Sequence, residues 1–83
     1  METRVAVITI IVSNGDSVET INGLLHEAAP FIIGRMGIPY HAKNINIITI
    51  AIDAPQDITS EVSGRIGRLE GVTVKTTYSN VIG

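Results

Sequence analysis

Two segments of this chain are apolar at almost every successive position, and they constrain the fold more than any other feature. Residues 4–12 read RVAVITIIV and residues 45–52 read INIITIAI, both rich in β-branched residues that favour strands. A strand of this kind has to be covered on both of its faces. The opposing sets are Ala6, Ile8, Ile10 and Val12 against Val5, Val7 and Ile11, and Ile48, Ile50 and Ile52 against Ile45, Ile47 and Ala51.

Two further segments have the spacing of amphipathic helices. The first follows a turn at residues 13–16, with Asp16 as its cap and Glu19 as the capping-box partner, and ends before Pro30. The second begins at residues 53–55, with Pro55 in its first turn, and ends at Gly71. Their apolar stripes are Val18, Ile21, Leu24, Leu25 and Ala28, and Ile58, Val62, Ile66 and Leu69.

The order of these elements predicts one ferredoxin-like domain over residues 1–83. A second strand over residues 31–38, a polar hairpin turn over 39–44 and an alternating strand over 72–78 complete a βαββαβ order. Right-handed crossovers then place both helices on one face of a four-stranded antiparallel sheet. The fold class is therefore α+β.

A single helical layer leaves the other face of this sheet uncovered. A chain of 83 residues buries only roughly 60–65% of its unfolded surface, and it has no cysteine to add disulfides. Charged residues make up 17% of it, against about 25% in an average domain. We therefore expect a homo-oligomer, a dimer or a tetramer, in which the bare face packs on another subunit. The alternative is a monomer with an apolar surface.

The composition also excludes several classes of function. The net charge is −2 and no basic run is present, so direct nucleic-acid binding is not expected. Apolar runs stay well below ~18 residues and no signal pattern opens the chain, so we expect a cytoplasmic protein without a membrane partner. No G-x-S-x-G, P-loop or cysteine nucleophile is present, which predicts a non-enzyme with no catalytic residue and no cofactor.

Two segments are candidate ligand sites. The turn formed by Ser13, Asn14, Gly15 and Asp16 places backbone N–H groups at a helix start, where a small anionic or zwitterionic ligand can dock. The alternative is a plain capped turn. In the second segment Arg35 lies between Gly34 and Gly37 in an otherwise apolar strand. The glycines indicate a bulge or a close backbone approach, and the arginine suits a carboxylate on a ligand or partner subunit. The alternative is a charge that protects an edge strand from aggregation.

The two histidines form no local metal pair. His26 lies in the first predicted helix and His41 in the hairpin turn. A metal would require them to meet across the fold or between subunits. The alternative is that both face solvent, and no metal site is predicted.

Several stretches resemble a known family. They are LLHE (24–27), IIGRMGIPY (32–40), DAP (53–55), SGRIG (63–67), LEGV (69–72) and VKT (74–76). Together they are similar to the iron-only ([FeFe]) hydrogenase system regulator family, from about Arg4 to about Ser79. The resemblance implies an ACT-like fold related to the C-terminal domain of nickel-responsive repressors, and an association with [FeFe] hydrogenase maturation in anaerobic bacteria.

Departures from those relatives limit what the resemblance carries over. The repressors' histidine-rich, cysteine-containing nickel site has no counterpart among the residues of this chain, and no ribbon-helix-helix segment is expected before the first strand. We therefore expect a non-enzymatic, ligand-sensing regulator that acts on a separate protein of regulation or hydrogenase maturation. The alternative is a metal- or cluster-linked accessory protein that uses His26 or His41 between subunits.

Overall fold

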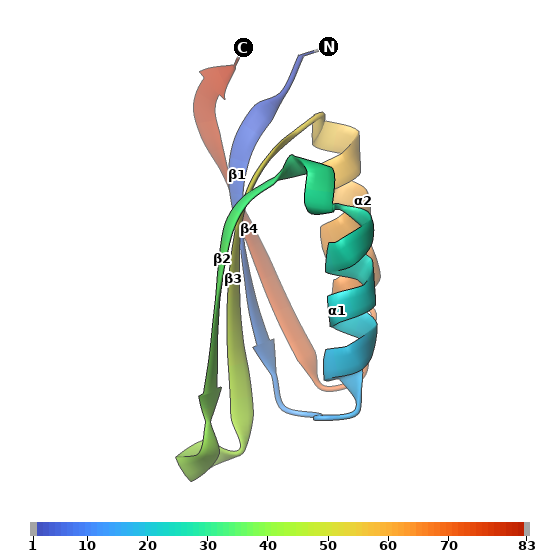
Figure 1. The fold of residues 1–83 in the computed structure, drawn as a ribbon, viewed down its shortest axis with the longest axis vertical. Coiled ribbons are helices and arrows are strands. Elements are labelled where there is room, and N and C mark those ends of the chain that lie inside the picture. Colours follow the sequence, from blue (N-terminus) through green and yellow to red (C-terminus); the bar gives the residue numbers. More distant parts are fainter. Residues whose placement is uncertain (1, 83) are drawn as a thin grey trace.

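A computed structural model of the chain describes residues 2–82, and its elements follow the predicted βαββαβ order (Figure 1). The sheet is antiparallel, with the strand order β2-β3-β1-β4, and both helices lie on one side of it (Figure 1). The predicted ferredoxin-like α+β fold is therefore confirmed. The elements are β1 (Arg4–Val12), α1 (Ser17–Glu27), η1 (Ala29–Phe31), β2 (Ile32–Tyr40), η2 (His41–Lys43), β3 (Ile45–Ala54), α2 (Gln56–Gly67) and β4 (Val72–Ile82).

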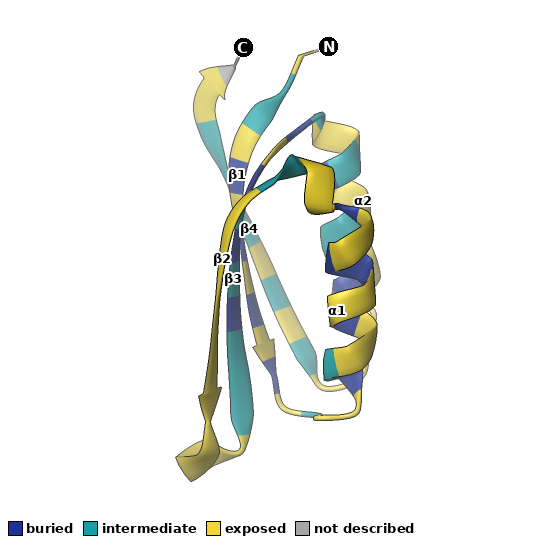
Figure 2. Ribbon diagram, in the orientation of Figure 1, coloured by how far each residue is buried: buried dark blue, intermediate teal, exposed yellow. Residues whose placement is uncertain are grey.

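The core lies between the helices and the two central strands, β1 and β3. Burial alternates along both strands, and of the two opposing apolar sets the one that contains Ile8 and Ile50 is buried beneath the helices (Figure 2). Isoleucine supplies most of the largest fully buried side chains, and its β-branched shape packs well on a pleated surface. The core residues are Ala6, Ile8, Ile10, Val12, Ile48, Ile50, Ile52 and Ala54 from the strands, and Ile21, Leu24, Leu25 and Ile66 from the helices.

The opposite side of the sheet carries the predicted second apolar set. Val5, Val7 and Ile11 are 39%, 37% and 45% exposed on β1. The pairing register adds residues of the edge strand β2 to the same side, because residues opposite each other in a sheet share a face. We call this side the open face: Val5, Val7, Ile11, Met36, Ile38, Tyr40, Ile45, Ile47 and Ala51.

Several boundaries differ from the prediction. β2 continues to Tyr40, because Pro39 lies on an edge strand, where a missing N–H is tolerated. β3 continues to Ala54, which is buried beneath the helices, so α2 begins only after Pro55. Phe31 belongs to the 3₁₀ turn η1, and β4 extends beyond residue 78.

None of the helices within residues 2–82 is both long enough and apolar enough to cross a bilayer.

Candidate functional site

The loop between β1 and α1 uses many of its polar groups within the chain. The Ser13 N–H donates to the Gly71 carbonyl at 2.7 Å, and the Ser17 N–H donates to the Asn14 carbonyl at 3.0 Å. The Asp16 N–H donates to Asn14 Oδ1 at 3.0 Å. Asp16 occupies the N-cap position, but its own side chain makes no capping bond, so the predicted capping box with Glu19 is wrong. Asn14 closes the turn instead, as asparagine side chains often do.

The same loop is tied to the turn that precedes β4. Ser13 Oγ donates to the Gly71 carbonyl at 3.0 Å, and Ser17 Oγ donates to the Glu70 carbonyl at 3.0 Å. Gly71 has a φ of +70°, and a Cβ at this residue would lie 2.7 Å from Asn14 Cβ. These contacts join two loops far apart in sequence into one braced end of the molecule.

The second predicted segment contains a β-bulge. Ile32 pairs with Ile52, but Gly34 already pairs with Ala51, so Ile33 is an extra residue in β2. The extra residue reverses the alternation of faces along the strand. Arg35 therefore pairs with the buried Ile50 and lies on the helical side of the sheet. In a regular strand without the bulge, Arg35 would lie on the open face.

From this position Arg35 reaches helix α1. Its Nη2 donates to Asn22 Oδ1 at 3.0 Å. Hollows of about 260 Å³ and 240 Å³ lie against this pair, between α1 and β2. We call them together the α1–β2 groove, which is lined by Val18, Asn22, Leu25, His26, Ala29, Ile32, Arg35, Gly37, Ile38, Pro39, Asn46, Ile47 and Ile48.

The groove unites part of the predicted site. Arg35 and Gly37 line it. Gly34 does not, but lies with Arg35, Met36, Thr49 and Ala51 around a separate shallow hollow. Neither glycine is required by a close contact within the chain, since a Cβ at either one would meet no atom within 4 Å. Ser13, Asn14, Gly15 and Asp16 line none of these hollows.

Sequence reasoning did not assign Asn22 and His26 to this site. The two residues are four apart on α1 and so share a helix face, which is the signal that would have found them. Val18 of α1 and Asn46 of β3 also line the groove. They meet there because of how α1 packs over the sheet, and no local sequence pattern predicts that packing.

The two histidines are not brought together. His26 lies near the C-terminal end of α1, while η2, which contains His41, lies at the other end of the molecule (Figure 1). Within residues 2–82 no three or more side chains of His, Cys, Asp or Glu are grouped so that they could hold a metal ion.

Comparison with protein families matches residues 4–76 to the TM1266-like family, described as "Iron-only hydrogenase system regulator, putative". This chain belongs to that family. The solved structure of TM1266 from Thermotoga maritima, a protein itself called uncharacterized, is similar at 31% identity and a TM-score of 0.87. The similarity covers 92% of this chain and 96% of that one.

More distant solved structures share the fold. The ACT domain of the GTP pyrophosphokinase of Chlorobium tepidum is 17% identical, with a TM-score of 0.76 over 90% of this chain and 99% of that one. The PII-like protein CPII of Thiomonas intermedia is 14% identical, with a TM-score of 0.60 over 100% of this chain and 97% of that one. No curated protein matches the chain.

Proposed function

We propose that this family member is a non-enzymatic, single-domain regulator of the iron-only hydrogenase system that senses a small carboxylate or other anion. The observation that carries the proposal is the orientation of Arg35 into the α1–β2 groove. The family description supports the regulatory role, and the ACT-like fold is compatible with it. The cysteine-free sequence is compatible with a cytoplasmic location.

Arg35 is suited to bind an anion. Among the described residues no carboxylate forms an ion pair with it, and one of its two Nη atoms is oriented by Asn22. A guanidinium has five donors in a planar fork that matches a carboxylate with two parallel hydrogen bonds. Leu25 and Ile32 provide apolar surface beside it. The groove therefore favours a small anion with an apolar portion.

The open face supports a homo-oligomer. Its apolar side chains cover β1 and β3 and continue onto β2, and exposed patches of this kind are typical of interfaces. In our proposal two copies pack these faces about a two-fold axis. The mass of the native assembly distinguishes such a dimer from a tetramer.

Regulation would pass through a separate protein of the hydrogenase system. The chain has eight acidic and six basic residues, so its charge does not attract the phosphates of nucleic acid. In the alternative, a metal- or cluster-linked accessory role, histidines of different subunits would have to meet, because His26 and His41 are far apart within one chain.

The test has two parts. In the first, the protein is titrated with a panel of α-amino acids and 2-oxo acids while its NMR spectrum is recorded. In the second, protein purified without oxygen is measured by native mass spectrometry. We expect saturable shifts at Asn22 and His26, an affinity at least tenfold weaker in Arg35→Leu, and no change in Arg68→Leu, the matched control.

Equal affinity in the Arg35→Leu and wild-type proteins would contradict the site. A stoichiometric metal in the native mass, lost in His26→Ala or His41→Ala, would replace the proposal with the accessory role.

A further inference from the structure

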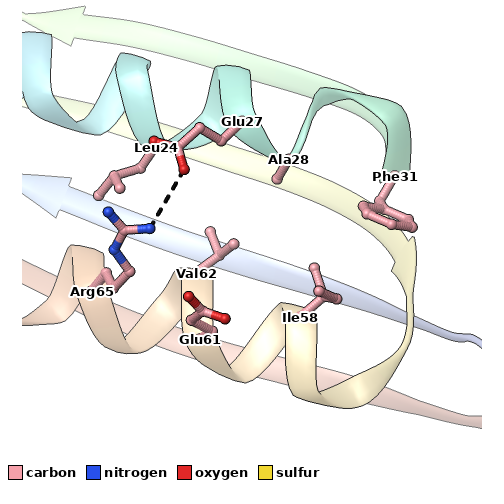
Figure 3. Close-up of a pocket in the computed structure, with 8 residues that line it drawn as sticks. All are labelled: Leu24, Glu27, Ala28, Phe31, Ile58, Glu61, Val62 and Arg65. Carbon is pink, nitrogen blue, oxygen red and sulfur yellow. Dashed lines mark ion pairs between the residues drawn. The ribbon is translucent and has the colours of Figure 1, made fainter.

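A cavity unrelated to Arg35 lies between the two helices (Figure 3). Its volume is about 130 Å³. Since a cavity of roughly 150 Å³ can hold a benzene molecule, this one suits a single apolar side chain. Its apolar lining consists of Leu24, Ala28, Phe31, Ile58 and Val62.

The rim of this cavity carries net negative charge. Arg65 Nη1 lies 3.5 Å from Glu27 Oε1, so this guanidinium is matched by one carboxylate (Figure 3). Glu61 is exposed on the same rim and forms no ion pair among the described residues. A group that enters the cavity is therefore favoured when a positive charge accompanies it.

A second copy of this chain is a poor occupant. A two-fold interface brings the same surface of both subunits together, so the acidic rim would face another acidic rim. Like charges placed against each other cost several kcal/mol. The open face offers self-association a larger apolar surface without that repulsion.

We propose that the cavity between α1 and α2 is the docking site for a partner protein, which inserts one apolar side chain flanked by lysine or arginine. The partner's apolar side chain occupies the space between Phe31, Ile58 and Val62, and its basic residue lies against Glu61. This inference rests on the proposed function only in assuming a protein partner, and it uses none of the residues that bind the anion.

The experiment selects peptides from a random display library on the full-length protein. We expect enriched peptides to contain an apolar residue next to, or three or four positions from, a lysine or arginine. Binding of a synthetic enriched peptide is then measured by calorimetry. Glu61→Lys should weaken it at least tenfold, whereas Glu19→Lys, the same charge change outside the cavity, should alter it less than twofold. Ile58→Ala should also weaken binding.

Several outcomes would overturn the inference. They are enrichment of peptides without a basic residue, an affinity for the enriched peptide that is unchanged in Glu61→Lys, and binding of butylammonium, a short alkyl chain with one positive charge, as tightly as the peptide. A change in oligomer mass in Glu61→Lys would identify a second copy as the occupant. Arg35→Leu separates the two proposals, because it should abolish anion binding and leave peptide binding intact.

Discussion

Gly71 illustrates how a single residue determines the geometry of one end of the molecule. Its φ is positive, and a side chain has no room there, because its Cβ would lie 2.7 Å from the Cβ of Asn14. We expect Gly71→Ala to lower the free energy of unfolding by about 2 kcal/mol, since a strained backbone of this kind costs of order 1–3 kcal/mol. Urea unfolding measures the difference.

Gly23 is the matched control for that variant. It lies within α1 and a Cβ there would meet no atom within 4 Å. Gly23→Ala should therefore stabilise the protein by up to about 1 kcal/mol, through helix propensity. If the Gly71→Ala and Gly23→Ala variants were equally stable, the close contacts of Gly71 with Ser13 and Asn14 would not constrain the fold.

Thr59 presents the opposite case, a polar group that the fold does not use. It is fully buried on α2, and its Oγ1 has no hydrogen-bond partner. Thr59→Val keeps the shape and removes the unsatisfied hydroxyl, so we expect the free energy of unfolding to rise by about 1 kcal/mol. Thermal and urea unfolding would detect this. A loss of stability would mean that the hydroxyl has a partner in solution.

At the level of the element, the bulge in β2 separates two stretches of regular pairing. Deletion of Ile33, which is 63% exposed, would join Ile32 to Gly34 in regular alternation and leave Arg35 opposite Ile50. We expect that variant to fold with a stability within about 1 kcal/mol of wild type, because little buried surface is lost. It should also retain its affinity for the anion.

Deletion of Met36 is the comparison. It removes a residue from the regular part of β2. The residues of β2 on one side of the deletion must then turn to the opposite face of the sheet. We expect a loss of several kcal/mol, measured by urea unfolding, or failure to fold. Equal tolerance of both deletions would show that β2 does not depend on its register with β3.

At the scale of the whole molecule, the open face predicts association in solution. Ile11→Lys places a charge at the centre of the apolar surface, and burying an unpaired charge is costly. We expect its self-association to weaken at least ~100-fold in sedimentation velocity, with an unchanged circular dichroism spectrum. Thr20→Lys, on the exposed side of α1, should remain associated. A wild-type protein that is monomeric at high concentration would contradict the interface.

Sequence reasoning predicted the element order and the two faces of the sheet, because both follow from short-range periodicity. It did not predict which way Arg35 points, since that depends on how β2 pairs with β3. Likewise, the acceptor for Ser13 is Gly71, which is 58 residues away, and no local pattern connects them. β3 continues two residues beyond the predicted end at Ile52, because burial of Ala54 depends on the position of the helices above it.

The abundance of isoleucine has a practical consequence. Ile8 and Ile50 report on the interior, Ile11 and Ile47 on the open face, Ile32 on the groove beside Arg35, and Ile58 on the cavity between the helices. Isotopic labelling of isoleucine methyl groups would therefore give one spectrum in which anion binding, self-association and peptide docking each shift a different set of signals. Phe31, the only phenylalanine, lines the same cavity as Ile58 and would spread the signals there through its ring current.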